Sequence, residues 1–125
     1  MGSNIWSGSK TFTGTAGQKT IVAVPAPPMG ELRGCIVTQV SGTTSGFTAK
    51  LYTTASQTPT FPLSHYLIAD VSAGAAEYAA YNLNIAYMNR DGDPTNRIGY
   101  VYLHITPVAA GNFTVTLTVG TPDFV

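Results

Sequence analysis

The sequence predicts an all-β protein with one β-sandwich domain of jelly-roll or immunoglobulin-like type and about eight strands. Apolar residues alternate with polar ones far more often than they recur at helical spacing. Threonine is the commonest residue, and 13 glycines and 8 prolines divide the chain into short segments. A chain of 125 residues can bury one real core and is too short for two comfortable domains. We expect an N-terminal arm at residues 1–8 and a sandwich domain at residues 9–125.

The first half of the chain contains four predicted strands, each ended by a turn signal. Pro25-Ala26-Pro27-Pro28 closes the second strand because proline lacks the N–H group that a central ladder requires. Residues 41–46 are rich in Ser, Thr and Gly and predict a hairpin loop. The third strand carries apolar residues on both faces, as expected of a central strand buried on two sides. These strands are predicted at residues 10–13, 18–24, 32–40 and 47–52.

The second half contains four more predicted strands. Residues 53–63 are rich in Thr, Ser and Pro without periodicity, which predicts a surface loop. Residues 72–80 are compatible with a loop or with a single helical turn. The clearest alternation lies near the C-terminus, where four apolar residues face away from three threonines. The strands are predicted at residues 66–71, 81–88, 98–106 and 112–119.

The charge balance and the N-terminus exclude several classes of partner. Six basic and six acidic residues give a net charge of 0, which removes the electrostatic basis for binding nucleic acid. No apolar run approaches the length of a membrane span, so no membrane partner is expected. Residues 1–6 lack the basic start, apolar run and cleavage site of a secretory signal. We therefore expect a chain that is made in a cytoplasm and binds neither nucleic acid nor membrane.

The residues that carry catalysis are few and poorly spaced. His65 and His104 are the only histidines, and their spacing suggests no Ser-His-Asp or Cys-His arrangement. Cys35 lies beside Ile36 on a predicted buried strand, where a cysteine is usually a small inert hydrophobe. We predict no enzymatic activity, no catalytic residue and no cofactor.

One loop partly matches a calcium site. In residues 89–96, Asn89, Asp91 and Asp93 have the oxygen spacing with which such a loop begins. Gly92 lies between the two acids, however, and Tyr100 stands where the bidentate glutamate would be. A plain hairpin tip is favoured, and no metal is predicted.

The candidate functional residues are interface residues. Tyrosines cover much area at little entropic cost, and they can also stack on sugars. Ile5 and Trp6 precede the first predicted strand, where a free tail would gain nothing from exposing them. Charged residues make up only 10% of the chain, and such a surface suits permanent contacts with neighbours. The predicted interface residues are Ile5, Trp6, Tyr100, Tyr102, Phe124 and Val125.

One predicted hairpin carries a family resemblance. Leu32-Arg33-Gly34-Cys35-Ile36-Val37-Thr38-Gln39-Val40-Ser41-Gly42, followed by Gly46-Phe47-Thr48-Ala49-Lys50-Leu51-Tyr52, resembles the hairpins of small β-rich virion proteins of tailed bacteriophages. These include head decoration or cement proteins, which sit on the capsid lattice, often as trimers, and reinforce it. The resemblance covers about a fifth of the chain and assigns no functional residue.

The resemblance and the surface chemistry together predict a structural virion protein. Its partners would be the major capsid protein and further copies of itself, with a trimer favoured. It would be synthesised in a host cytoplasm and lie on the capsid surface of the virion. The alternative is a receptor-binding or carbohydrate-binding β-sandwich module that uses surface tyrosines and the loop at residues 53–63.

Overall fold

The computed structural model describes residues 3–27, 29–42, 45–88 and 99–122. No helix in this part of the chain is long and apolar enough to cross a membrane. The elements are β1 (Ser3–Gly14), β2 (Thr20–Pro25), β3 (Met29–Gly42), β4 (Phe47–Tyr52), the 3-10 helix η1 (Leu63–Tyr66), β5 (Leu67–Asp70), β6 (Glu77–Ala80), β7 (Ile85–Met88), β8 (Tyr100–Pro107) and β9 (Gly111–Pro122).

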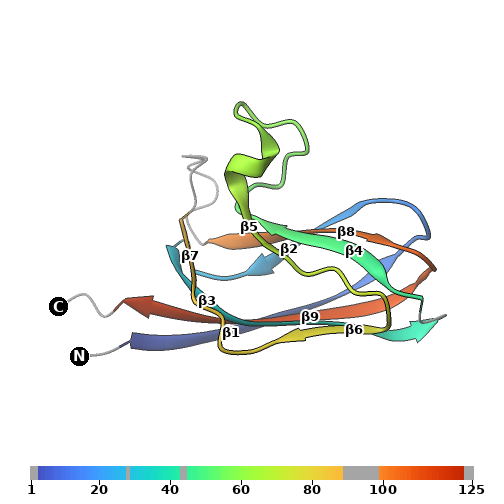
Figure 1. Ribbon diagram of the computed structural model, residues 1–125, viewed down its shortest axis with the longest axis horizontal. Coiled ribbons are helices and arrows are strands. Elements are labelled where there is room, and N and C mark those ends of the chain that lie inside the picture. Colours follow the sequence, from blue (N-terminus) through green and yellow to red (C-terminus); the bar gives the residue numbers. More distant parts are fainter. Residues whose placement is uncertain (1–2, 28, 43–44, 89–98, 123–125) are drawn as a thin grey trace.

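The strands form two antiparallel sheets packed face to face (Figure 1). Sheet A has the order β1-β9-β3-β6, with β7 also paired to β3, and sheet B has the order β2-β8-β4-β5. The pairing is nested, because β1 pairs with β9, β2 with β8, β3 with β6 and β7, and β4 with β5. Since β6 and β7 together take the place of one strand, this is the eight-strand plan of a jelly roll. The predicted β-sandwich is confirmed, and the topology is that of the jelly-roll type.

Strand β1 is much longer than the sequence predicts. It pairs with β9 in unbroken register from Ser3 opposite Pro122 to Gly14 opposite Gly111. The predicted boundary between an arm and the domain, after residue 8, therefore falls inside a continuous strand.

Between β6 and β7 the chain leaves the sheet. Cys35 pairs with Ala80 and Leu32 pairs with Ile85, so two residues of β3 lie opposite the four residues 81–84. The surplus residues must arch away from the sheet, and we call residues 81–84 the β6–β7 arch. A hydrogen bond of 2.8 Å from the Leu83 amide to the Arg33 carbonyl holds the arch to β3. The strand predicted at residues 81–88 consequently begins only at Ile85, and a short strand, β6, lies within residues 72–80.

Strand β3 is central in its sheet, but only one of its faces is covered. Cys35 and Val37 point into the sandwich and are fully buried, whereas Ile36 is half-buried and Val40 is exposed on the outer face. The expectation of burial on both faces was wrong because the sandwich has only two layers. A bulge between Leu32 and Gly34 shifts the alternation of β3.

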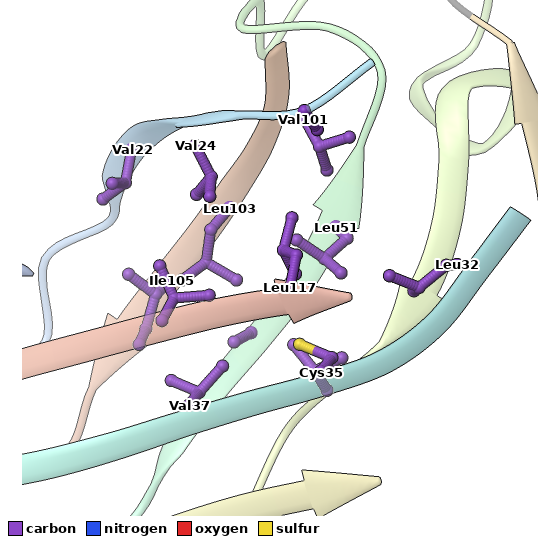
Figure 2. Packing of buried hydrophobic residues seen from close by; sticks show 14 of the residues in the cluster. Val22, Val24, Leu32, Cys35, Val37, Leu51, Val101, Leu103, Ile105 and Leu117 are labelled. Atoms are coloured by element: carbon purple, nitrogen blue, oxygen red, sulfur yellow. The ribbon is translucent and has the colours of Figure 1, made fainter. Parts of the chain in front are cut away.

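The core lies between the sheets and takes the alternate residues of their central strands (Figure 2). Phe113 stacks on Phe12 with ring centroids 5.5 Å apart and meets Phe47 edge-on at 6.0 Å. The largest fully buried side chains are Phe113, Leu32, Leu51, Leu103, Ile105, Leu117, Val24, Val37, Val71, Val101, Val115 and Val119.

The buried thiol of Cys35 and the buried phenol of Tyr87 make the stability of the fold depend on pH in alkaline solution. Burial raises the pKa of Cys35 from 9.0 to about 12 and that of Tyr87 from 10.0 to about 12. Both groups stay protonated in the folded chain while they ionise in the unfolded chain, so stability is complete below pH 9 and is lost as the pH rises towards 12. For Cys35 alone, we expect a loss of about 1 kcal/mol between pH 8 and pH 10.

Urea unfolding at pH 8 and pH 10 tests this, with Cys35→Ala as the second protein. Between the two pH values, the free energy of unfolding should fall less in Cys35→Ala than in the wild type. Because each protein is compared with itself, the change in packing caused by the substitution cancels. Equal losses in both proteins would contradict the assignment to the thiol.

Candidate interaction surfaces

The outer face of sheet A is covered with hydroxyl groups. Because the apolar residues of β9 from Phe113 to Val119 are fully buried, the alternating threonines of this strand point outward. The matching positions of β1 and β3 add further Ser and Thr side chains through the strand register. We call this surface the hydroxyl face, and it consists of Ser7, Ser9, Thr11, Thr13, Thr38, Thr114, Thr116 and Thr118.

Side chains on the hydroxyl face bind one another across strands. The hydroxyl oxygens of Thr11 and Thr114 are 3.3 Å apart, and the Thr38 hydroxyl donates to the Glu77 carboxylate at 2.9 Å. Exposed hydroxyls can pair with water or with a partner protein, and burying them costs much less than burying charges.

The edge formed by β1 and β2 carries exposed apolar side chains. Ile5 is 58% exposed and Trp6 is 43% exposed, although both lie in a regular strand. The Trp6 indole N–H donates to the Pro25 carbonyl at 3.2 Å, which ties β1 to the edge strand of sheet B. Pro25 pairs in turn with Tyr100, whose ring centroid is 6.2 Å from that of Tyr102.

Tyr100 and Tyr102 alternate with the buried residues Val101 and Leu103, so they lie on the outer face of sheet B. Ile5 and Trp6 are consecutive on β1, so their side chains point to opposite faces of that strand. The structure therefore does not bring these four predicted residues onto one surface, and we call Ile5 and Trp6 alone the edge patch. Phe124 and Val125, the other two predicted interface residues, lie outside the described residues.

The outer face of sheet B carries an aromatic pair beneath a loop. Tyr52 and His104 have ring centroids 4.4 Å apart, and His104 Nε2 donates to the Thr54 carbonyl at 2.9 Å. Burial is the largest cause that lowers the pKa of His104, and the nearby charge of Lys19 lowers this pKa further. The hydrogen bond to Thr54 acts in the opposite direction and raises it. A neutral His104 fixed by a backbone carbonyl acts here as a structural residue that holds the loop.

The loop predicted at residues 53–63 projects from the sandwich on the side of sheet B (Figure 1). Its two ends are joined because the Thr53 amide donates to the Tyr66 carbonyl at 2.9 Å. His65 lies in η1 and contacts the Phe61 ring, with centroids 5.2 Å apart. The two histidines thus sit in separate aromatic contacts. Among the described residues, no group of three or more His, Cys, Asp or Glu side chains is placed to hold a metal, and residues 89–96 lie outside that part of the chain.

A hollow lies on the outer face of sheet A beneath the β6–β7 arch. Its volume is about 480 Å³, within the range of about 300–1,000 Å³ found for ligand sites. Tyr81 is 67% exposed, and Asn82 adopts a left-handed backbone with φ of 61°. The lining residues are Glu31, Arg33, Gly34, Tyr81, Asn82, Leu83, Asn84 and Thr118.

The charged groups of this hollow are held in place. Arg33 Nε lies 3.3 Å from Glu31 Oε1, and both side chains are a little more than one-third exposed. A Cβ atom at Gly120 would meet the Arg33 guanidinium carbon at 2.5 Å, so the guanidinium lies directly over that glycine. Asn84, with its amide nitrogen turned towards the acceptors, donates to the Leu83 carbonyl at 2.9 Å and to Glu31 Oε1 at 3.2 Å.

The sequence does not predict this hollow. Arg33, Gly34 and Tyr81 fall inside the strands predicted at residues 32–40 and 81–88, where a regular sheet surface is expected. A detectable signal was the cluster of Asn82 and Asn84 around Leu83, since asparagine is unfavourable in a strand and tolerates a left-handed backbone.

Comparison with known proteins found similar solved structures but no matching family. No protein-family model matches the chain, and no curated protein matches it. Among solved structures, a chain of the cyanophage Pam1 capsid asymmetric unit is similar over 97% of this chain and 87% of that chain. The two are 21% identical in sequence, with a TM-score of 0.48. A likeness of this degree says nothing of this chain's function.

Proposed function

We propose that this chain is a non-enzymatic structural protein of a virion, which decorates the outside of the capsid and reinforces it. The observation that carries the proposal is the edge patch, where Ile5 and Trp6 are exposed on an outermost strand of a charge-poor protein. The proposed partners are the major capsid protein and further copies of the chain, with a trimer favoured.

The free edge of β1 suits a permanent neighbour. β1 is the outermost strand of sheet A and is 12 residues long, so part of its backbone hydrogen-bonding groups face away from β9. Long edge strands are usually protected by charges, bulges or proline. Lys10 is the one charged residue of β1, and the register with β9 is unbroken. An edge of this kind favours association with another protein.

The surrounding surface favours the same role. The outward positions of β1 and β9 are mainly Ser and Thr, whose burial against a partner leaves no unpaired charge. Many such contacts, repeated over a lattice, would bridge capsid subunits and resist internal pressure.

Point substitutions test the edge patch better than a deletion would. Removing the first seven residues, most of the predicted arm, would also remove five of the 12 residues of β1, which pairs with β9. Ile5→Glu changes one outward side chain instead. We expect Ile5→Glu to weaken binding to decoration-free capsids of the encoding virus at least about tenfold, because the carboxylate would lose water at the interface.

Val108→Glu is the matched control, since Val108 is 64% exposed in the turn between β8 and β9, away from the edge patch. Co-sedimentation with the capsids measures binding, and thermal unfolding shows that both variants fold. Equal binding by wild type and Ile5→Glu would contradict the edge patch as the attachment site, and no binding by the wild-type chain would contradict the capsid role. Light scattering of the wild-type chain separately tests the trimer.

A further inference from the structure

We propose that residues 53–66 form a cover over sheet B that opens in acid, when His104 takes up a proton. We call these residues the cover loop, which consists of the loop at residues 53–63 together with η1. This inference goes beyond the capsid role and does not depend on it, because the edge patch lies on β1 whereas the cover loop is bound to β8.

His104 lies beneath the cover loop as a neutral ring. It stands between the core residues Leu103 and Ile105 on β8, so its side chain points to the outer face of sheet B, yet it is only 3% exposed. Its Nε2 atom lies 2.9 Å from the Thr54 carbonyl oxygen, which can only accept, so Nε2 carries the hydrogen of the neutral ring. The Nδ1 atom is buried, and no described residue forms a hydrogen bond with it. The closed loop therefore holds a histidine with one nitrogen paired and the other unpaired.

Protonation of Nδ1 would place an unpaired cationic donor beneath the loop. Burying a charge without a partner costs far more than burying a neutral polar group. Burial is accordingly the largest cause that lowers the pKa of His104, and it outweighs the hydrogen bond to Thr54, which raises this pKa. When the loop leaves, the imidazolium ring reaches water and the penalty disappears. Acid therefore favours the open loop.

Lysine side chains beside His104 oppose its protonation further. Lys50 on β4 is the direct partner of His104 in the register between β4 and β8. On the β2 side the partner is the uncharged Ile21, but Lys19 directly precedes that strand and its charge lowers the pKa of His104. The two lysines and His104 line one small pocket of about 110 Å³. A third positive charge here is favourable only if the loop admits water.

The acidic group on this side of Lys50 is already engaged. Asp70 on β5 pairs with Lys50, and its carboxylate accepts hydrogen bonds from the Ser72 hydroxyl at 2.7 Å and from the Ser72 amide at 3.0 Å. The hydrogen bonds from Ser72 lower the pKa of Asp70 from 3.8, so this carboxylate stays ionised in mild acid. The cover loop contains no Asp, Glu, Lys or Arg. The titratable groups near it also include the phenols of Tyr52, Tyr66 and Tyr102, which stay neutral in acid, and the exposed His65.

The cover loop can move without unfolding the sandwich. It projects from the sandwich (Figure 1), and its ends are joined by the hydrogen bond of 2.9 Å from the Thr53 amide to the Tyr66 carbonyl. Inside the loop, the Ser56 amide donates to the Thr54 hydroxyl and the Thr58 amide donates to the Ser56 hydroxyl, each at 3.1 Å. These bonds involve no core strand and persist when the loop swings about its joined ends. Opening breaks the bond between His104 and Thr54.

Opening changes the chemistry of the surface of sheet B. Tyr52 is 8% exposed, and its ring centroid lies 4.4 Å from that of His104. With the loop displaced, the two rings face solvent beside Lys50 and Lys19. The chain then presents an aromatic and cationic surface in acid, where at neutral pH it presents an uncharged loop.

The pH window follows from the two states of His104. In the open loop its pKa returns to about the ordinary value of 6.5, and in the closed loop it is lower. The closed loop is therefore fully favoured above pH 6.5. Below that pH the ratio of open to closed loop rises by up to about tenfold per pH unit, until the pKa of the closed form is passed.

NMR of the full chain between pH 7.5 and pH 4.5, with a soluble nitroxide as the probe of exposure, tests the proposal. We expect the relaxation enhancement of the Tyr52 ring protons to rise at least about threefold at pH 4.5, with the same midpoint as the His104 ring signal. The ring signals of Phe113 in the core should not change. A Tyr52 ring that stays protected, or a His104 ring that titrates without any change at Tyr52, would overturn the proposal.

Two matched variants assign the response to one histidine. In His104→Gln the side-chain amide can still donate to the Thr54 carbonyl but takes up no proton, so the exposure of Tyr52 should no longer depend on pH. His65→Gln removes the exposed histidine of η1 and should keep the wild-type response. Each variant is compared with itself at the two pH values, so a change in packing cancels. The same pH response in both variants would overturn the role of His104, and neither result bears on the capsid assay.

Discussion

Replacing Phe113 with alanine is expected to lower the free energy of unfolding by about 3–5 kcal/mol. Phe113 is fully buried on β9 and contacts the rings of Phe12 and Phe47, which come from the neighbouring strand and from the opposite sheet. The substitution removes buried apolar area and leaves a cavity, because rings fixed on two different sheets can close only part of the gap.

Chemical unfolding of Phe113→Ala measures this loss, and Phe12→Ala is the comparison. Phe12 is half-buried on an edge strand, so its removal should cost clearly less. Equal losses at the two positions would show that Phe113 is not the centre of this aromatic group.

Replacing Gly46 with alanine is expected to destabilise the protein by at least about 3 kcal/mol. Gly46 has a φ of 95°, and a Cβ atom there would lie 2.6 Å from the Ala73 carbonyl oxygen and 2.9 Å from the Gly74 carbonyl carbon. The positive φ strains the backbone of any L-residue. The close contact would push away the segment at Ala73, which pairs with Phe47.

Gly17→Ala separates these two effects. Gly17 has a φ of 71°, but an added Cβ meets nothing within 4 Å. Its substitution should therefore cost about 1–2 kcal/mol, the strain alone. If urea unfolding gives the same loss for both variants, the close contact at Gly46 contributes nothing.

Strands and their two faces are predicted best from the sequence where one face is buried and the other is exposed to solvent. In β9 the alternation of apolar residues with threonine directly gives the inner face and the hydroxyl face. Such a pattern needs no knowledge of the strand's partners, because the period of two is a local property of the extended chain.

The edge patch and the hollow depend on distant parts of the chain. Ser7-Gly8-Ser9 has little strand propensity, so the first strand is predicted to begin only at residue 10, too late to include Trp6. These residues are nevertheless extended because they pair with β9. A glycine is needed at position 8 because a Cβ atom there would lie 2.6 Å from the Pro25 carbonyl oxygen, which is too close. The β6–β7 arch arises in the same way from a mismatch with β3 that only the paired register reveals.

The nested pairing also determines when the protein can fold. The ladder between β1 and β9 joins Ser3 to Pro122, so one of the largest strand contacts closes a loop that contains nearly the whole described chain. Contacts so distant in sequence make folding slow, on the order of milliseconds to seconds. During synthesis β1 must wait for β9, and until then its exposed edge can be captured by another chain. Rapid assembly with a neighbour would shorten the life of that vulnerable state.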